Sequence, residues 1–133
     1  MHIVCCVKQV PDWDIPPSSF KVDEATKQVV PPAGVAPVPS QFDSIGVEAA
    51  MRVKDQQPDT KVTIMSMGPE SARDVIKHSL AMGADEGVLL ADALFQDLDW
   101  YQLALVLSTA VKKLDGGMSQ SGTCLTHTTT CTR

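Results

Sequence analysis

The sequence predicts an α/β domain built around a parallel sheet. Short apolar runs alternate with segments of helical periodicity, which is the pattern of successive β–α–β units. The clearest unit runs from Ser66 to Asp92, where an apolar run ends in Ser-Met-Gly-Pro, a helix follows, Gly83 ends it and a second apolar run begins. The chain has 133 residues, 44% of them apolar, which is enough for one domain with a sizeable core.

The first third of the chain predicts a strand followed by a hairpin. Residues 2–8 (HIVCCVK) form a short, almost continuous apolar run that is typical of a strand buried on both faces. Residues 20–30 (FKVDEATKQVV) predict a β-hairpin that turns at Glu24-Ala25-Thr26-Lys27. Residues 31–41 contain four prolines, so the backbone there is expected to be extended or turning.

The second third predicts two helices and two strands. Asp43 or Ser44 is expected to cap a helix that runs to about Gln57. Its inward face is predicted to consist of Ile45, Ala49 and Val53. Further along, the sequence predicts a strand at 61–66 (KVTIMS), a helix at 71–82 and a strand at 87–90. The second helix is expected to bury Ala72, Val75, Ile76 and Leu80, with Gly83 in the position just after its end.

The last periodic segment is a helix over residues 101–114. Its apolar stripe has spacings of three and four and consists of Leu103, Val106, Leu107, Ala110, Val111 and Leu114. Residues 115–133 (DGGMSQSGTCLTHTTTCTR) are polar and aperiodic and carry no strand signal. We therefore expect a nucleotide-binding α/β domain over 1–114 that is incomplete, followed by an irregular polar tail over 115–133.

Charge and hydropathy exclude several classes of partner. The net charge is −5 and no dense run of Lys or Arg occurs, so nucleic acid is not expected as a partner. No stretch reaches the roughly 18 apolar residues of a membrane span, so no direct membrane insertion is expected. The start of the chain does not resemble a signal peptide. We expect a cytoplasmic protein, or one of the mitochondrial matrix in a eukaryote, with Cys5 and Cys6 reduced and buried.

The turn after residue 66 has two interpretations. Gly68 could let backbone N–H groups approach a phosphate, with Ser66 as a hydroxyl donor, or it could simply be the glycine of an ordinary βα turn. Lys8 could face an anionic group or be a solvated lysine at a strand end. Trp100 and its neighbour Tyr101 could stack on an adenine or isoalloxazine ring, as could Trp13, or they could pack at an edge or interface.

Covalent and metal chemistry find no support in the sequence. No Ser-His-Asp order, Walker motif or convincing carboxylate pair occurs, so we predict no catalytic residues. Cys124, His127 and Cys131 have the spacing of a metal half-site, but a closed structural zinc site needs four ligands. We therefore predict no metal site.

Three segments together resemble the beta subunit of the electron transfer flavoproteins. Residues 3–12 (IVCCVKQVPD) resemble its opening strand and loop. Residues 42–54 (FDSIGVEAAMRVK) are similar to its F-D-x-x-x-x-E-x-A-x-R-x-K helix, and residues 62–92, with S-M-G-P and A-M-G-A-D, resemble its central βαβ unit. The resemblance covers about residues 1–115, whereas the family's subunit is roughly twice as long as this chain.

The resemblance implies a fold, a role and partners. The fold would be a Rossmann-like, three-layer α/β domain of the adenine nucleotide alpha hydrolase-like type, with an N-terminal β-hairpin insertion. The subunit would bind AMP or FAD and pair with an alpha subunit that holds the redox FAD. The pair would carry electrons from flavin dehydrogenases to an acceptor oxidoreductase, with no catalysis by the protein itself. Alternatives are a stand-alone adenine-nucleotide-binding module and a truncated, inactive product.

The resemblance also implies the positions of the nucleotide-binding residues. These are Cys6, Val7, Lys8, Gln9, Ser40, Phe42, Ser66, Met67 and Gly68. Two departures from the family pattern stand out. The family's N-P-F-D-E is Ser40-Gln41-Phe42-Asp43-Ser44 here, and its D-T-L-A-T is Asp99-Trp100-Tyr101-Gln102-Leu103, which replaces two threonines. No counterpart of the family's later Gly-rich loop occurs in residues 115–133.

Overall fold

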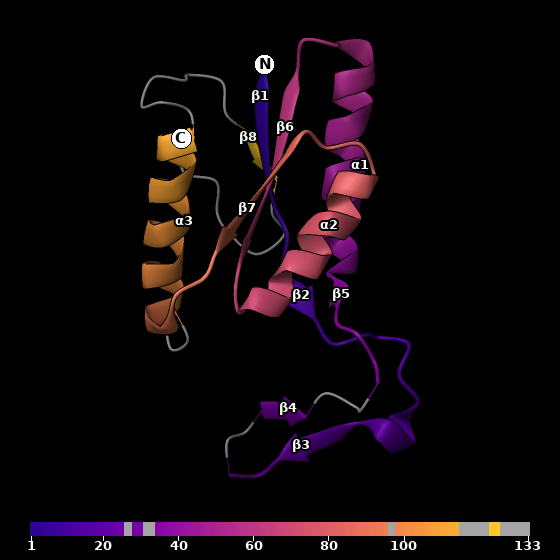
Figure 1. Cartoon of the computed structure of the whole chain (residues 1–133). Coiled ribbons are helices and arrows are strands. Elements are labelled where there is room, and N and C mark those ends of the chain that lie inside the picture. Colours follow the sequence, from indigo (N-terminus) through magenta and orange to yellow (C-terminus); the bar gives the residue numbers. More distant parts are fainter. Residues whose placement is uncertain (26–27, 31–33, 96–97, 115–122, 126–133) are drawn as a thin grey trace.

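A parallel sheet lies between two layers of helices (Figure 1). This computed structural model describes residues 1–25, 28–30, 34–95, 98–114 and 123–125. The sheet has the strand order β7-β6-β1-β8, and every neighbouring pair is parallel. The strands are β1 (His2–Cys6), β6 (Lys61–Met67), β7 (Glu86–Leu90) and β8 (Thr123–Leu125). The predicted Rossmann-like α/β fold is confirmed, and the C-terminal ends of these strands share one edge of the sheet.

The two faces of the sheet are covered by different helices. Side chains alternate along β1, so Ile3 and Cys5 pack with helices α1 (Gln41–Gln56) and α2 (Arg73–Ala81). Val4 and Cys6 point the other way and pack against α3 (Trp100–Leu114). Both cysteines are buried, as predicted. This arrangement gives the three layers that the resemblance implied.

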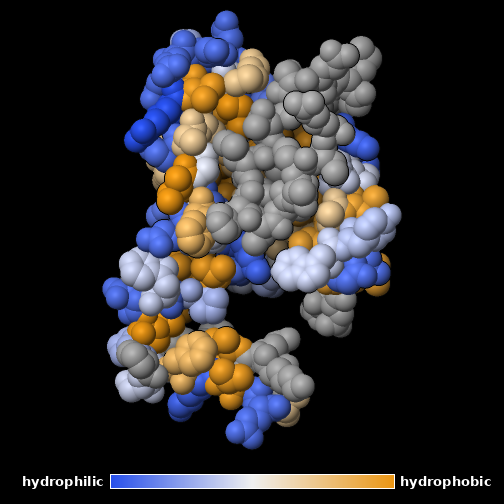
Figure 2. All heavy atoms as spheres, turned by 180° about the vertical axis from the view of Figure 1, so that it is seen from behind, coloured by the Kyte–Doolittle hydropathy of each residue, from blue (hydrophilic) through white to orange (hydrophobic). Residues whose placement is uncertain are grey.

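The predicted hairpin is an insertion between β1 and α1. Strands β3 (Lys21–Asp23) and β4 (Gln28–Val30) pair antiparallel, and the hairpin projects away from the rest of the molecule (Figure 1). Two short strands that the sequence did not reveal, β2 (Gln9–Val10) and β5 (Val38–Pro39), pair antiparallel at its base. The chain therefore leaves and re-enters the domain at one place, next to the end of β1. Apolar atoms gather on this arm (Figure 2), where Phe20, Val22, Val29 and Val30 are exposed.

Helix α1 differs from its prediction in both its start and its buried face. It begins at Gln41, with Ser40 as the N-cap residue. The predicted inward residues Ile45 and Ala49 are exposed, and only Val53 is partly buried. The buried positions are Asp43, Val47, Ala50 and Met51. The predicted stripe was wrong because the apolar residues Val47, Ala50 and Met51 form a second stripe, and this is the one that packs on the sheet together with the Asp43 carboxylate.

The second helical segment confirms its prediction. A 3-10 turn at Glu70–Ala72 leads into α2, and Val75 and Ile76 are buried while Leu80 packs on the same core. Gly83 has φ of 115°, and its N–H donates to the carbonyl of Leu80 at 2.9 Å. Gly83 therefore ends the helix as the sequence indicated.

Helix α3 follows its prediction, but the segment after it does not. Leu107, Ala110, Val111 and Leu114 pack on the sheet, although every residue of the predicted stripe stays partly exposed. The expectation that residues 115–133 contain no strand is wrong at Thr123–Leu125, because β8 pairs with β1 and places Ile3 opposite Thr123. A strand that pairs over three residues is too short for a recognisable hydrophobic pattern, so it left no signal in the sequence. The division at residue 114 stays a prediction, since residues 115–122 and 126–133 lie outside the described part.

The remaining elements are short. The chain forms 3-10 turns at Pro17–Ser19 and Ala93–Phe95. Among the described residues, no helix is both long enough and apolar enough to cross a membrane.

Candidate functional site

The order of the strands indicates where a ligand can bind. The chain builds the sheet outward from β1 through β6 to β7, then crosses to the other side of β1 to form β8. Helices α1 and α2 lie on one face and α3 on the other, so the crossing leaves a crevice at the C-terminal end of β1. In open α/β sheets ligands bind at such a point of reversal.

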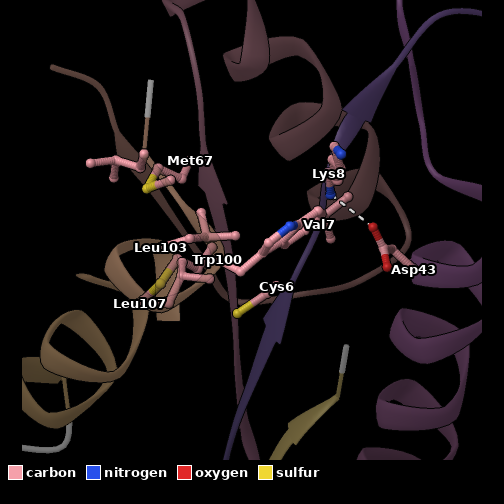
Figure 3. A pocket seen from close by; sticks show the side chains of 10 residues that line it. Cys6, Val7, Lys8, Asp43, Met67, Trp100, Leu103 and Leu107 are labelled. Atoms are coloured by element: carbon pink, nitrogen blue, oxygen red, sulfur yellow. Dashed lines mark hydrogen bonds between the residues drawn. The ribbon is translucent and has the colours of Figure 1, made fainter. Parts of the chain in front are cut away.

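A cavity of about 270 Å³ opens at this position (Figure 3). Leu103 and Leu107 enter it from α3, and Asp43 enters from α1 on the opposite side. Between them lies the end of β1 with Val7 and Lys8. Its complete lining comprises Cys6, Val7, Lys8, Asp43, Met65, Met67, Leu98, Trp100, Leu103 and Leu107.

The walls of the cavity are mostly apolar and rich in sulfur. Cys6 and Met65 are buried and form its deepest part, while Trp100 and Lys8 are exposed and lie at its mouth. The cavity volume is close to the lower end of the roughly 300–1,000 Å³ that small-molecule sites occupy. It can therefore hold a ring system or a similar part of a ligand, with the remainder outside.

The N-terminus of α1 holds the backbone of Lys8 at two points. The carboxylate of Asp43 accepts the Lys8 N–H at 2.8 Å, and the Lys8 carbonyl accepts the N–H of Ser40 at 2.9 Å. The preceding residue, Val7, donates its N–H to the Met65 carbonyl at 2.8 Å. The strand end that lines the cavity is thus fixed by its sheet neighbour and by the helix that follows the hairpin.

Four of the nine sequence-predicted binding residues line the cavity. Cys6, Val7 and Lys8 do so from the end of β1, and Met67 does so from the end of β6. These two strand ends are neighbours because Cys6 lies opposite Met65 in the parallel ladder. The structure therefore brings together residues that are about 60 positions apart in the sequence.

Two predicted residues near the hairpin base support the cavity from outside its lining. Ser40 caps α1, and its carbonyl accepts both the N–H and the hydroxyl of Ser44. Gln9 lies in β2, where its side-chain oxygen accepts the Ser71 hydroxyl at 3.1 Å. Phe42, on the first turn of α1, is 57% exposed and is not part of the lining.

The other two predicted residues lie outside the lining, Ser66 within β6 and Gly68 in the turn that follows it. Ser66 is buried, and its hydroxyl has no hydrogen-bond partner among the described residues. The N–H of Gly68 donates to the Leu90 carbonyl at 3.1 Å, so this amide is already used within the sheet. The phosphate contacts expected of this turn stay a prediction.

Six of the lining residues are not among the nine predicted binding residues, and of these six the sequence indicates only Trp100 as a residue that could stack on a ring. The helical periodicity predicts Leu103 and Leu107 as core positions of α3, and Asp43 is one of two residues expected to cap α1. Trp100 carried the most useful signal, because an aromatic residue stands where the resemblance expects threonine. Met65 and Leu98 carried no signal, since apolar residues near strand ends are common.

No metal centre is evident in the described ranges. They contain no cluster of three or more His, Cys, Asp or Glu side chains with the arrangement of a metal site. Of the tail residues considered as ligands, Cys124 lies in β8, while His127 and Cys131 lie outside the described residues.

Comparison with known proteins places the chain in a family. Residues 29–129 match the electron transfer flavoprotein domain. The chain belongs to the electron transfer flavoprotein family. It is 42% identical over 122 residues to the electron transfer flavoprotein subunit beta of Megasphaera elsdenii, covering 90% of this chain and 43% of that protein.

Other family members show similar identity. The caffeyl-CoA reductase-Etf complex subunit CarD of Acetobacterium woodii is 37% identical over 86% of this chain and 42% of its own length. Protein FixA of Azorhizobium caulinodans is 38% identical over 86% of this chain and 38% of its own length. The chain therefore spans about two fifths of the length of these curated relatives.

Proposed function

We propose that this chain is the nucleotide-holding part of an electron transfer flavoprotein beta subunit. It would bind AMP or FAD at the end of β1 and pair with an FAD-bearing alpha subunit. The pair would carry electrons from flavin dehydrogenases to an acceptor oxidoreductase. The observation that carries the proposal is the cavity at the strand-order reversal, lined by Cys6, Lys8 and Met67.

The residues of the cavity suit an adenine nucleotide. Its deep part is apolar and accepts a flat ring, while the exposed side chain of Lys8 at the mouth offers a cation for the phosphate. The buried carboxylate of Asp43 accepts hydrogen bonds from donors of the ligand or of the backbone. When bound, a flavin supplies the electron chemistry, and the protein residues supply position and exclude water.

Calorimetric titration of the whole chain with AMP and with FAD tests this proposal. We expect saturable binding of at least one of the two. Lys8→Glu should weaken it at least tenfold, which corresponds to about 1.4 kcal/mol, because the new carboxylate repels the phosphate. Lys112→Glu is the matched control, since Lys112 is an exposed lysine at the far end of α3.

Two results would contradict the proposal. One is the absence of AMP and FAD binding by the folded chain. The other is an equal loss of affinity in both lysine variants, which would indicate a general effect of charge and no phosphate contact at Lys8. Association with an alpha subunit is tested separately by co-expression, which should yield a yellow heterodimer while the chain alone is colourless.

A further inference from the structure

The cavity has a charge distribution that orients a nucleotide. Asp43 is 6% exposed and contributes a carboxylate to one wall, whereas Lys8 is exposed at the mouth. A phosphate pushed inside would meet this carboxylate in a medium of low dielectric constant, where repulsion is strong. The phosphate therefore belongs at the mouth, and the uncharged ring belongs inside.

Trp100 is the aromatic side chain of the cavity. It is 74% exposed and belongs to neither core cluster, so it contributes little to the folded core. It nevertheless lines the cavity together with Leu103, one helical turn further along α3 (Figure 3). An indole with an open face at the mouth of an apolar cavity can stack on a planar ligand ring.

The backbone beneath Trp100 is held in place by a capping box. The Asp99 carboxylate accepts the Gln102 N–H at 2.7 Å, and the Gln102 side-chain oxygen accepts the Asp99 N–H at 3.1 Å. This reciprocal pair fixes the first turn of α3. Trp100 directly follows the cap residue Asp99, so the position of its backbone is fixed although its side chain is exposed.

We infer that Trp100 determines specificity by stacking on the aromatic ring of the ligand that enters this cavity, an inference that rests on the proposed function. The indole stands where the resemblance expects threonine. Stacking favours ligands with a purine or flavin ring over sugar phosphates that carry the same charge.

Tryptophan fluorescence and calorimetry test the inference on the whole chain. The chain has two tryptophans, so Trp13→Phe leaves Trp100 as the sole reporter. In this variant AMP should change the fluorescence, and ribose 5-phosphate, which lacks the ring, should not. Trp100→Leu should weaken AMP binding at least fivefold, while Trp100→Phe should retain most of the affinity.

Tyr101→Leu is the matched control. Tyr101 is the next residue on α3, is as exposed as Trp100 and does not belong to the cavity lining. Its replacement should leave AMP affinity unchanged. Equal weakening by Tyr101→Leu and Trp100→Leu would overturn the inference, because it would indicate a disturbed helix.

The remaining outcomes separate this inference from the proposed function. Normal AMP binding by Trp100→Leu, without a fluorescence change in Trp13→Phe, would overturn the stacking role and leave the nucleotide site standing. Failure of the wild-type chain to bind either AMP or FAD would overturn both.

Discussion

The carboxylate of Asp43 is the most consequential single group in the structure. It is buried in the first turn of α1 and accepts the N–H of Lys8, which lies 35 positions earlier in the chain. This bond joins the helix after the hairpin to the strand before it. Asp43 also lies on the buried face of α1 and lines the cavity, so one side chain contributes both to the helix contact and to the cavity wall.

Removing this carboxylate should destabilise the fold. We expect Asp43→Ala to lower the free energy of unfolding by about 1–3 kcal/mol, because the Lys8 N–H loses a charged acceptor at a partly buried position. Asp43→Asn should cost less, since an amide oxygen can still accept. Urea unfolding measures both, with Asp55→Ala, an exposed acid in the last turn of α1, as a control expected within about 0.5 kcal/mol of wild type. A similar loss of stability in Asp55→Ala would contradict the role assigned to the Asp43–Lys8 hydrogen bond.

Asp85 gives a prediction about pH. The hydrogen bond from Lys54 at 2.6 Å and that from the Val62 N–H at 2.8 Å lower the pKa of Asp85 below its ordinary value of 3.8. A carboxyl group with a lower pKa in the folded than in the unfolded state stabilises the fold, and this stabilisation is fully present above the unfolded pKa. It is lost as the pH falls from the unfolded pKa through the folded pKa. The side chain is 38% exposed, so solvent screening keeps the effect modest.

We therefore expect Asp85→Asn to be less stable than wild type at neutral pH. The difference should shrink once the pH falls below 3.8 and vanish below the folded pKa. Chemical unfolding at a series of pH values measures this. Asp74→Asn, which removes a more exposed ion pair with Lys77, should show little difference at any pH. A difference in the free energy of unfolding between Asp85→Asn and wild type that persists at acid pH would contradict the lowered pKa of Asp85.

At the scale of elements, packing between α2 and β7 depends on a glycine. A Cβ atom at Gly87 would lie 2.3 Å from the Cγ2 atom of Ile76, which is a forbidden distance. Ile76 is β-branched and has little rotamer freedom in a helix, so relief requires movement of the helix.

Gly87→Ala should therefore lower the free energy of unfolding by about 1–3 kcal/mol, although alanine is ordinarily tolerated in a strand. Gly68→Ala is the control, because a Cβ there would meet the Cβ of Ala72 at an acceptable 3.4 Å. Thermal unfolding of both variants provides the comparison. If Gly87→Ala leaves the stability unchanged, α2 is free to shift away from β7.

The elements also show where sequence reasoning succeeds. Local signals sufficed for the hairpin, for α2 with its Gly83 end, and for the strands at Lys61–Met67 and Glu86–Leu90. The buried face of α1 was missed because the helix offers two apolar stripes, one with Ile45, Ala49 and Val53 and one with Val47, Ala50 and Met51, and only its packing on the sheet decides between them.

The same limit applies to pairs of short strands and to the site. The strands β2 and β5 pair over two residues each, and β8 over three, so their backbone ladders leave no hydrophobic pattern. The resemblance located the strand ends that line the cavity. It missed the wall formed by α3, whose residues look like ordinary core positions until the helix is placed on the sheet.

At the scale of the whole molecule, β8 is the element that shields one edge of β1. A chain ending at Leu114 would leave that edge of β1 without a partner among the described strands, and an open apolar strand is a template for association. We expect this truncation to lower the unfolding midpoint and to form aggregates. A chain ending at His127, which retains Thr123–Leu125, should remain closer to wild type.

Size-exclusion chromatography and hydrogen exchange distinguish these outcomes. Amides of β8 that join the ladder with β1 should exchange more slowly than an unfolded peptide in the intact chain. Unfolded exchange rates across Thr123–Leu125, together with a monodisperse Leu114 truncation, would show that β8 contributes nothing to the stability of the sheet.

The position of β1 in the sheet also has a consequence for biosynthesis. Of the four strands in this sheet, β1 is translated first, and it is an interior strand. Its partners on the two sides, which begin at Lys61 and Thr123, are translated much later. At about 5–20 residues per second, the second of these arrives on the order of ten seconds after β1 itself. For that interval the nascent chain carries an apolar strand with an unsatisfied edge, and the four-stranded sheet is complete only once Leu125 has been translated.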